Sequence, residues 1–256
     1  ARGGHDAAEI RDDAVSTLFH VADLHFGRED VAAVSAFAAL VRAERPDAVL
    51  ITGDLTMKAR RHEFDAAAAW MATLEVPLSI EVGNHDLPYF NLWNRFVNPY
   101  ARIERLARAL ERPLNLPDVA IVPLRTTARA QLRLNWAHGF VTPRRVRDAV
   151  TALEAVPDER VRIIACHHPL YDRPGGIAEG KTRGGRAALF ALSQARCDLV
   201  VSGHVHDPFD ITWVDGSHPV RMVGAGTLSE RTRATPPSYN RIVIDAGKVT
   251  VSAESF

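Results

Sequence analysis

Short, mainly apolar runs alternate with longer amphipathic stretches along the first third of the chain. The runs at 17–22, 47–52 and 77–82 predict three buried strands. Between them, apolar residues recur at helical spacing over 29–44 and 63–74, which predicts two helices. Strands that alternate with helices in this way are typical of parallel sheets, because a helical crossover returns the chain to the same edge. The first third therefore predicts an α/β fold.

The remainder of the chain continues this pattern and then changes. The same criteria predict strands at 119–124, 161–166 and 197–201, and helices at 142–156 and 186–195. After His206, short apolar segments are separated by turn signals at Asp215-Gly216 and Ala246-Gly247, which predicts antiparallel strands up to the C-terminus. The sequence shows no repeat of fixed period and no linker rich enough to divide it, so we expect a single domain over residues 1–256.

Residues 87–112 interrupt the alternation and predict a helical insertion. The segment starts with aromatic residues and continues with arginines at 102, 105, 108 and 112. Its aromatic residues are Tyr89, Phe90, Trp93, Phe96 and Tyr100. Two interpretations remain open: the insertion forms a cap that covers a nearby site, or its aromatic residues pack into the core of the domain.

Side chains that can bind metal ions follow the predicted strands. They are Asp23, His25, Asp54, Asn84, His85, His167, His168, His204 and His206. Ligand sites of open α/β sheets lie beyond the carboxyl ends of the strands, so we expect these side chains to converge. His204 and His206 stand two residues apart and share one face of an extended chain. Each motif alone is as well explained by a surface turn, but motifs in order after five strands are not.

The number and kind of these side chains favour two metal ions. Oxygen and imidazole ligands suit borderline cations, and one zinc ion takes only three or four of them. Two cations about 3.5–4 Å apart need a bridging ligand, usually a carboxylate. Asp54 stands in the middle of the series and is the candidate bridge.

Composition indicates which partners and which cellular compartment to expect. The 31 basic and 31 acidic residues cancel, which argues against a nucleic-acid partner bound through a broad basic surface. No apolar run approaches the roughly 20 residues of a membrane span. Cys166 and Cys197 fall in predicted buried strands and form no disulfide framework, which fits a reducing cytosol. We expect a cytoplasmic protein, with peripheral contact to lipid at the inner face of a membrane as the alternative.

Five motifs resemble the sequence blocks of the calcineurin-like metallophosphoesterases, a resemblance that runs from about residue 17 to residue 206. They are Asp23-x-His25, Gly53-Asp54, Gly83-Asn84-His85-Asp86, His167-His168-Pro169 and Gly203-His204-x-His206. The resemblance implies a four-layer α/β/β/α sandwich, in which two mixed sheets pack face to face with helices outside. It also implies one metal ion bound by Asp23, His25, Asp54 and His206, and a second bound by Asp54, Asn84, His167 and His204.

The resemblance further implies a reaction and roles for the remaining residues. The two ions, which this ligand set accepts as manganese, iron, zinc or cobalt, would activate a bridging hydroxide for attack on phosphorus. His85 would act as a catalytic imidazole at the leaving group. Asp86 would either orient His85 or cap a turn, and His168 would lie behind the ligands or face the substrate.

The expected function is therefore that of a dinuclear metal-dependent phosphodiesterase acting on a small cyclic nucleotide or glycerophosphodiester. A lipid-linked nucleotide-sugar pyrophosphatase of the UDP-diacylglucosamine type, working on a phosphoanhydride at a membrane surface, is the alternative favoured by the aromatic insertion. A catalytically silent scaffold of the same fold is the alternative outside enzymes. The complete set of expected ligands argues against the scaffold.

Overall fold

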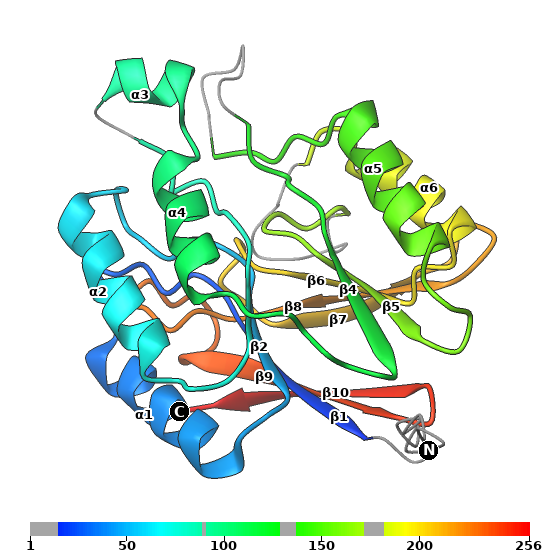
Figure 1. The fold of residues 1–256 in the computed structure, drawn as a ribbon, viewed down its shortest axis with the longest axis horizontal. Helices are drawn as coiled ribbons and strands as arrows, with labels where there is room; N and C mark the ends of the chain where they lie inside the picture. The colour runs from blue at the N-terminus through cyan, green and yellow to red at the C-terminus, as the bar shows by residue number, and fades with distance from the viewer. Residues whose placement is uncertain (1–14, 89–90, 129–136, 172–181) are drawn as a thin grey trace, which may run out of the picture.

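Two five-stranded mixed sheets form the centre of the protein (Figure 1), as seen in a computed structural model that describes residues 15–88, 91–128, 137–171 and 182–256. The first sheet has the strand order β10-β9-β1-β2-β3. Its strands are β1 (Ser16–Val21), β2 (Ala48–Ile51), β3 (Leu78–Ile80), β9 (Ser238–Asp245) and β10 (Lys248–Ser255). Strands β1, β2 and β3 are parallel, as predicted, and β9 pairs with β1 in antiparallel orientation.

The second sheet has the order β4-β5-β6-β8-β7. Its strands are β4 (Val119–Pro123), β5 (Val161–Ala165), β6 (Leu199–Ser202), β7 (Phe209–Trp213) and β8 (Val220–Gly224). Strands β4, β5, β6 and β8 are parallel, and β7 is antiparallel to β8. The prediction that all strands after His206 are antiparallel is therefore wrong for β8, because alternation of apolar residues indicates a strand without indicating its partner.

Helices cover the outer faces of both sheets. The first sheet carries α1 (Val31–Glu44), α2 (Arg61–Ala72) and α4 (Ala101–Leu110), and the second carries α5 (Pro143–Glu154) and α6 (Gly185–Gln194). Side-chain caps begin two of these helices: Asp30 accepts from the backbone N–H of Ala33, and Thr142 accepts from that of Arg145. The layers are helix, sheet, sheet and helix, which confirms the predicted sandwich.

Period-two alternation along the strands builds two kinds of core. In β1, Phe19 and Val21 pack toward the helices, whereas Leu18 faces the second sheet. Leu18 joins Leu50 of β2 and Val201 of β6 in a fully buried cluster between the sheets. Burial of such a side chain stabilises the fold by about 1.5–3 kcal/mol. This central layer fixes the two sheets against each other and so fixes the ends of their strands.

The insertion consists of α3 (Leu92–Val97) and α4, which differ in their surroundings. Helix α4 packs against α2 and β3 and buries Ile103 and Leu106 in the core. Helix α3 precedes α4 in the chain and lies beyond its N-terminal end, away from the two sheets (Figure 1). Its Trp93 is 76% exposed. Tyr89 and Phe90 lie outside the described residues. The core interpretation thus fits α4, while a cap formed by α3 stays a prediction.

Among the helices of the described segments, none combines the length and the apolar character that crossing a membrane requires.

Candidate metal centre

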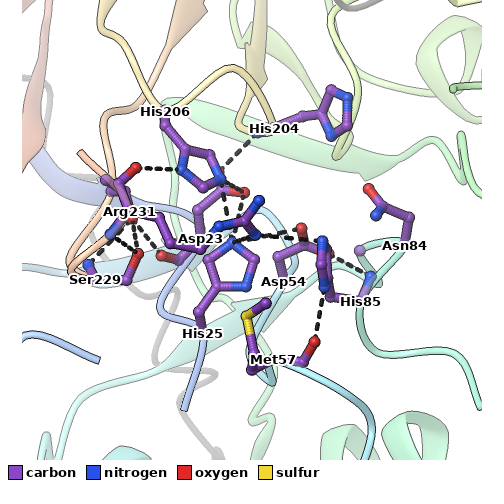
Figure 2. A network of polar contacts seen from close by, with 12 residues as sticks. Asp23, His25, Asp54, Met57, Asn84, His85, His204, His206, Ser229 and Arg231 are labelled. Atoms are coloured by element: carbon purple, nitrogen blue, oxygen red, sulfur yellow. Dashed lines mark hydrogen bonds and ion pairs between the residues drawn. The ribbon is translucent and has the colours of Figure 1, made fainter. Parts of the chain in front are cut away.

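The predicted ligands meet where the strands of both sheets end. Asp23, Asp54 and Asn84 follow β1, β2 and β3 of the first sheet, while His167 follows β5 and the pair His204/His206 follows β6 of the second. Figure 2 shows most of these side chains converging on one region. His25 and His206, which are 181 positions apart in the chain, are in contact here. The packing of the two sheets therefore assembles the site.

Backbone conformation at the strand ends is unusual. Five of the predicted ligands adopt positive φ angles: Asp23 (55°), His25 (48°), Asp54 (53°), His204 (72°) and His206 (57°). Asp and His tolerate this left-handed region better than most side chains, yet each instance still costs on the order of 1–3 kcal/mol. Clustering of such strain is typical of functional sites, where packing of the surrounding structure maintains it.

The first cluster contains Asp23, His25, Asp54 and His206. The Nε2 atom of His206 lies 3.1 Å from Asp23 Oδ1 and 3.1 Å from His25 Nε2, and His25 Nε2 lies 3.8 Å from Asp54 Oδ2. Asp23 Oδ2 accepts the backbone N–H of His204, whereas its buried Oδ1 has no hydrogen-bond partner among the described residues. Two carboxylate oxygens and two imidazole nitrogens that converge in this way fit a divalent metal ion.

The second cluster contains Asp54, Asn84, His167 and His204. His167 Nε2 lies 3.1 Å from Asn84 Oδ1 and 3.5 Å from Asp54 Oδ1. The Nδ1–H of His167 donates to the carbonyl of Thr52 at 2.8 Å, so Nε2 carries the lone pair. A ligand nitrogen of His204 lies within 4.8 Å of one on His167. Asp54 thus presents Oδ2 to one cluster and Oδ1 to the other, as a bridging carboxylate would.

Protonation states in the site also suit metal binding. Burial lowers the pKa of His25 and of His204 to about 3, so both imidazoles are neutral near pH 7. For Asp54, burial acts to raise the pKa, but the nearby His167 and His85 outweigh it and hold the pKa below its usual value. Neutral imidazoles and an ionised carboxylate are the forms that bind metal ions.

His206 is the exception among the imidazoles of the site. Burial acts to lower its pKa, but the adjacent Asp23 carboxylate raises it above the usual value. A metal ion at the first cluster would therefore compete with a proton for His206.

His168 is adjacent to His167 in the chain but has a different environment. Its Nε2–H donates to the carbonyl of Ala137 at 2.8 Å, and its Nδ1 pairs with the hydroxyl of Thr126 at 2.9 Å. A carbonyl can only accept, so the hydroxyl must donate to Nδ1 and no lone pair remains free. Burial also holds the pKa of His168 well below its usual value. The geometry supports His167 as the ligand and places His168 behind it.

His85 lies beside the first cluster, with its ring centroid 4.8 Å from that of His25. Its Nδ1–H donates to the carbonyl of Met57 at 2.7 Å, which leaves Nε2 facing the site (Figure 2). Of the two roles left open for Asp86, the geometry favours the turn cap, because the Asp86 carboxylate accepts from the backbone N–H groups of Thr56 and Gly83. Asp86 caps the turn, and a backbone carbonyl orients the catalytic candidate.

Sequence reasoning missed Arg231. Its guanidinium donates to His25 Nε2 at 3.2 Å and to His85 Nε2 at 3.3 Å. Arg231 and Arg233 line a pocket of about 230 Å³ together with Asp54, Asn84 and His85. They lie in the loop between β8 and β9, which follows no ligand-bearing strand. The only signal was the presence of two arginines in a polar segment soon after the last motif.

Comparison with known proteins agrees with this geometry. Residues 16–208 match the family model for calcineurin-like phosphoesterases. A probable cyclic nucleotide phosphodiesterase from Rhodopseudomonas palustris is 25% identical over 248 residues, which cover 90% of this chain and 86% of the relative.

Solved structures show the same fold. A dimetal phosphatase from Danio rerio aligns with a TM-score of 0.59 at 14% identity, covering 94% of this chain and 99% of that one. The purple acid phosphatase PPD1 from yellow lupin aligns with a TM-score of 0.67 at 12% identity, covering 94% of this chain and 52% of that one. With a family match over most of its length, the chain belongs to the calcineurin-like phosphoesterases.

Proposed function

We propose that the protein is a dinuclear metal-dependent phosphodiesterase. The observation that carries this proposal is the position of Asp54, whose two carboxylate oxygens face two separate clusters of ligand atoms. Asp23, His25 and His206 complete the first set, and Asn84, His167 and His204 complete the second. When bound, two divalent cations would supply an activated water and would hold the phosphoryl oxygens.

The chain itself supplies orientation and proton transfer. The carbonyl of Met57 fixes the ring of His85 so that Nε2 faces the site. From this position His85 can give a proton to the leaving oxygen of the substrate once Nε2 is protonated and no longer accepts from Arg231. The hydrogen bond from His167 Nδ1–H to the carbonyl of Thr52 runs from one sheet to the other and holds the His167 ring, so this part of the ligand set is preorganised.

The pocket and a relative of this chain support a class of substrate. A volume of about 230 Å³ suits a compact substrate, and Arg231 and Arg233 give the pocket a positive wall that suits an anion. The relative from Rhodopseudomonas palustris is named as a probable cyclic nucleotide phosphodiesterase. We therefore propose a small phosphodiester, with a cyclic nucleotide as the first candidate.

Turnover of bis-p-nitrophenyl phosphate by the manganese-loaded protein tests the proposal. We expect hydrolysis that a chelator abolishes, at a rate above that for p-nitrophenyl phosphate, a monoester. The matched control is Asp54→Asn, which keeps the size of the side chain and removes its charge. Metal binding without turnover of either ester would favour the silent scaffold, and faster monoester turnover would overturn the phosphodiester assignment.

A lipid-linked phosphoanhydride is a second candidate, favoured by one observation. Helix α3 exposes Trp93 at 76%, Phe96 at 46% and Val97 at 55%, an unusual concentration of exposed apolar side chains. Such a surface could bind an acyl chain or a membrane interface. Trp93→Ala should raise KM for a lipid-linked pyrophosphate and leave KM for the nitrophenyl diester unchanged. Equal effects on both substrates would exclude this role for α3.

A further inference from the structure

The guanidinium of Arg231 reaches into the candidate metal centre from the loop between β8 and β9 (Figure 2). A guanidinium can only donate hydrogen bonds, so His25 Nε2 and His85 Nε2 must both accept from it. One arginine thus touches a predicted metal ligand and the candidate acid at the same time.

The loop fixes Arg231 in this position through buried contacts. The carbonyl of Arg231 accepts from His206 Nδ1 at 2.8 Å, and its backbone N–H donates to Ser229 Oγ at 3.3 Å. The hydroxyl of Thr227 donates to the carbonyl of Asp23 at 2.6 Å and lies 2.7 Å from Ser229 Oγ. Thr227 and Ser229 are almost fully buried. The loop is therefore tied to the backbone of one ligand and to the ring of another.

Among the described residues, no carboxylate pairs with the charge of Arg231. Within the described part of the chain, no ion pair forms with Arg231, and the neighbouring Glu230 pairs with Arg28 on the surface. A half-buried guanidinium beside a predicted cation site would be repelled by the metal ions unless an anion lies between them. This electrostatic arrangement indicates an anionic ligand.

Metal binding would also remove one of the two acceptors of the guanidinium. Coordination by His25 Nε2 uses the lone pair that now accepts from Arg231, so the guanidinium must find another acceptor. The acceptor that the proposed reaction brings to this pocket is a phosphoryl oxygen. Planar N–H groups match such oxygens with two parallel hydrogen bonds.

We propose that Arg231 binds the phosphoryl group of the substrate and positions it against the metal ions and His85. This inference rests on the proposed function for the identity of its anion. Arg233, an exposed arginine that lines the same pocket, lies at its rim and would contact the substrate farther from phosphorus.

Binding of inorganic phosphate to the manganese-loaded protein, measured by calorimetry, tests the role of Arg231. Arg231→Gln should weaken phosphate binding about 10- to 100-fold, the range for loss of a hydrogen bond to a charged group. Arg231→Lys keeps the charge but loses the planar pair of donors, so its affinity should lie between those of the other two proteins. Elemental analysis should show the same metal content in all three proteins.

The matched control is Arg45→Gln, which removes the same charge from an exposed site just before β2, at the opposite end of the strands from the metal centre. It should change phosphate affinity less than twofold. Phosphate affinity unchanged in Arg231→Gln, or metal lost from that variant, would overturn the inference, as would a wild-type protein that binds no phosphate. Phosphate binding that depends on Arg231 in a protein that hydrolyses no ester would support the inference and reject the proposed function.

Discussion

At the residue scale, two adjacent histidines show how hydrogen bonding assigns a role. His167 uses Nδ1 to bond the carbonyl of Thr52 and keeps Nε2 for the site, whereas His168 uses both nitrogens within the protein. Sequence alone could not separate them, since both follow β5 directly. The family pattern favoured His167, and the geometry gives the physical reason.

His167→Ala should therefore lose metal, while His168→Ala should keep most of it. The second variant should instead unfold at a lower temperature, because it leaves a cavity and unpaired partners at Thr126 and Ala137. Elemental analysis and thermal unfolding of both variants separate the two effects. Metal loss in His168→Ala with full occupancy in His167→Ala would show that the ligand is one residue later than assigned.

The position of His85 leads to a prediction about mechanism. Its ring is held by the carbonyl of Met57, so His85→Ala should keep both metal ions and the fold. General-acid assistance is typically worth about 10²–10⁴-fold, and we expect a loss of that size with alkyl diesters. The loss should be much smaller with nitrophenyl diesters, whose leaving group needs no proton. Equal losses on both classes, measured as kcat, would show that His85 positions the phosphate instead.

At the element scale, the turns after the strands place the ligands. Gly83 follows β3, and its backbone packs directly against the side chain and backbone N–H of Asp54. A methyl group at Gly83 would collide with both, so Gly83→Ala should displace the bridging carboxylate and lose metal. Elemental analysis of the purified variant measures this loss.

Gly247 provides the control for this change. It forms the β9–β10 turn at φ 78° with no atom near an added methyl group. Gly247→Ala should therefore lower the thermal unfolding temperature through backbone strain alone and keep full metal content. Metal loss in both variants would indicate general unfolding and not displacement of Asp54.

The elements that sequence predicted well are those whose pattern is local. Strands β2, β5 and β6 are continuous buried runs, and β1 is buried at all positions but Thr17. The turn predicted at Ala246-Gly247 joins β9 to β10, with both residues at positive φ. The division of the last four strands between two sheets was not predictable, since it depends on distant partners. Arg231 and the carbonyl of Met57 were missed for a related reason: a loop arginine and a backbone oxygen carry no periodic signal.

At the scale of the whole molecule, one buried carboxyl links stability to pH. Glu81 lies in a second cavity, of about 430 Å³, between β3, α4 and β4, which Glu104, Glu111 and Arg125 also line. Burial is the main cause that raises the pKa of Glu81 from 4.5 to about 8, and the charge of Glu111 adds to it. The charge of Arg125 acts to lower the pKa. The folded state therefore keeps a proton that the unfolded state releases between these two pKa values.

Stability from Glu81 should thus be complete below pH 4.5 and should fall as the pH rises to about 8. The glutamine of Glu81→Gln is neutral in the folded and the unfolded state, so the stability of this variant does not fall in this pH range on account of residue 81. In the wild-type protein the fall is on the order of 1 kcal/mol per pKa unit. The difference in unfolding temperature between Glu81→Gln and wild type, measured without metal, should increase from pH 5 to pH 8. A constant difference would show that the carboxyl is solvated in the folded protein.

The candidate metal centre also joins the two sheets. Asp23, Asp54 and Asn84 follow strands of the first sheet, and His167, His204 and His206 follow strands of the second. An ion that binds only the folded state at 100 times its Kd stabilises it by about 2.7 kcal/mol. For a chain of this size, that corresponds to roughly 5–10 °C in unfolding temperature per site. We expect a chelator to lower the unfolding temperature of the metal-loaded protein by this amount for each ion.

Asp54→Asn, which removes the charge that both clusters share, should lose both ions and should unfold at the same temperature with and without chelator. Loss of one ion only, with half of the chelator effect retained, would show that Asp54 belongs to a single site and that the second ion binds without a bridge.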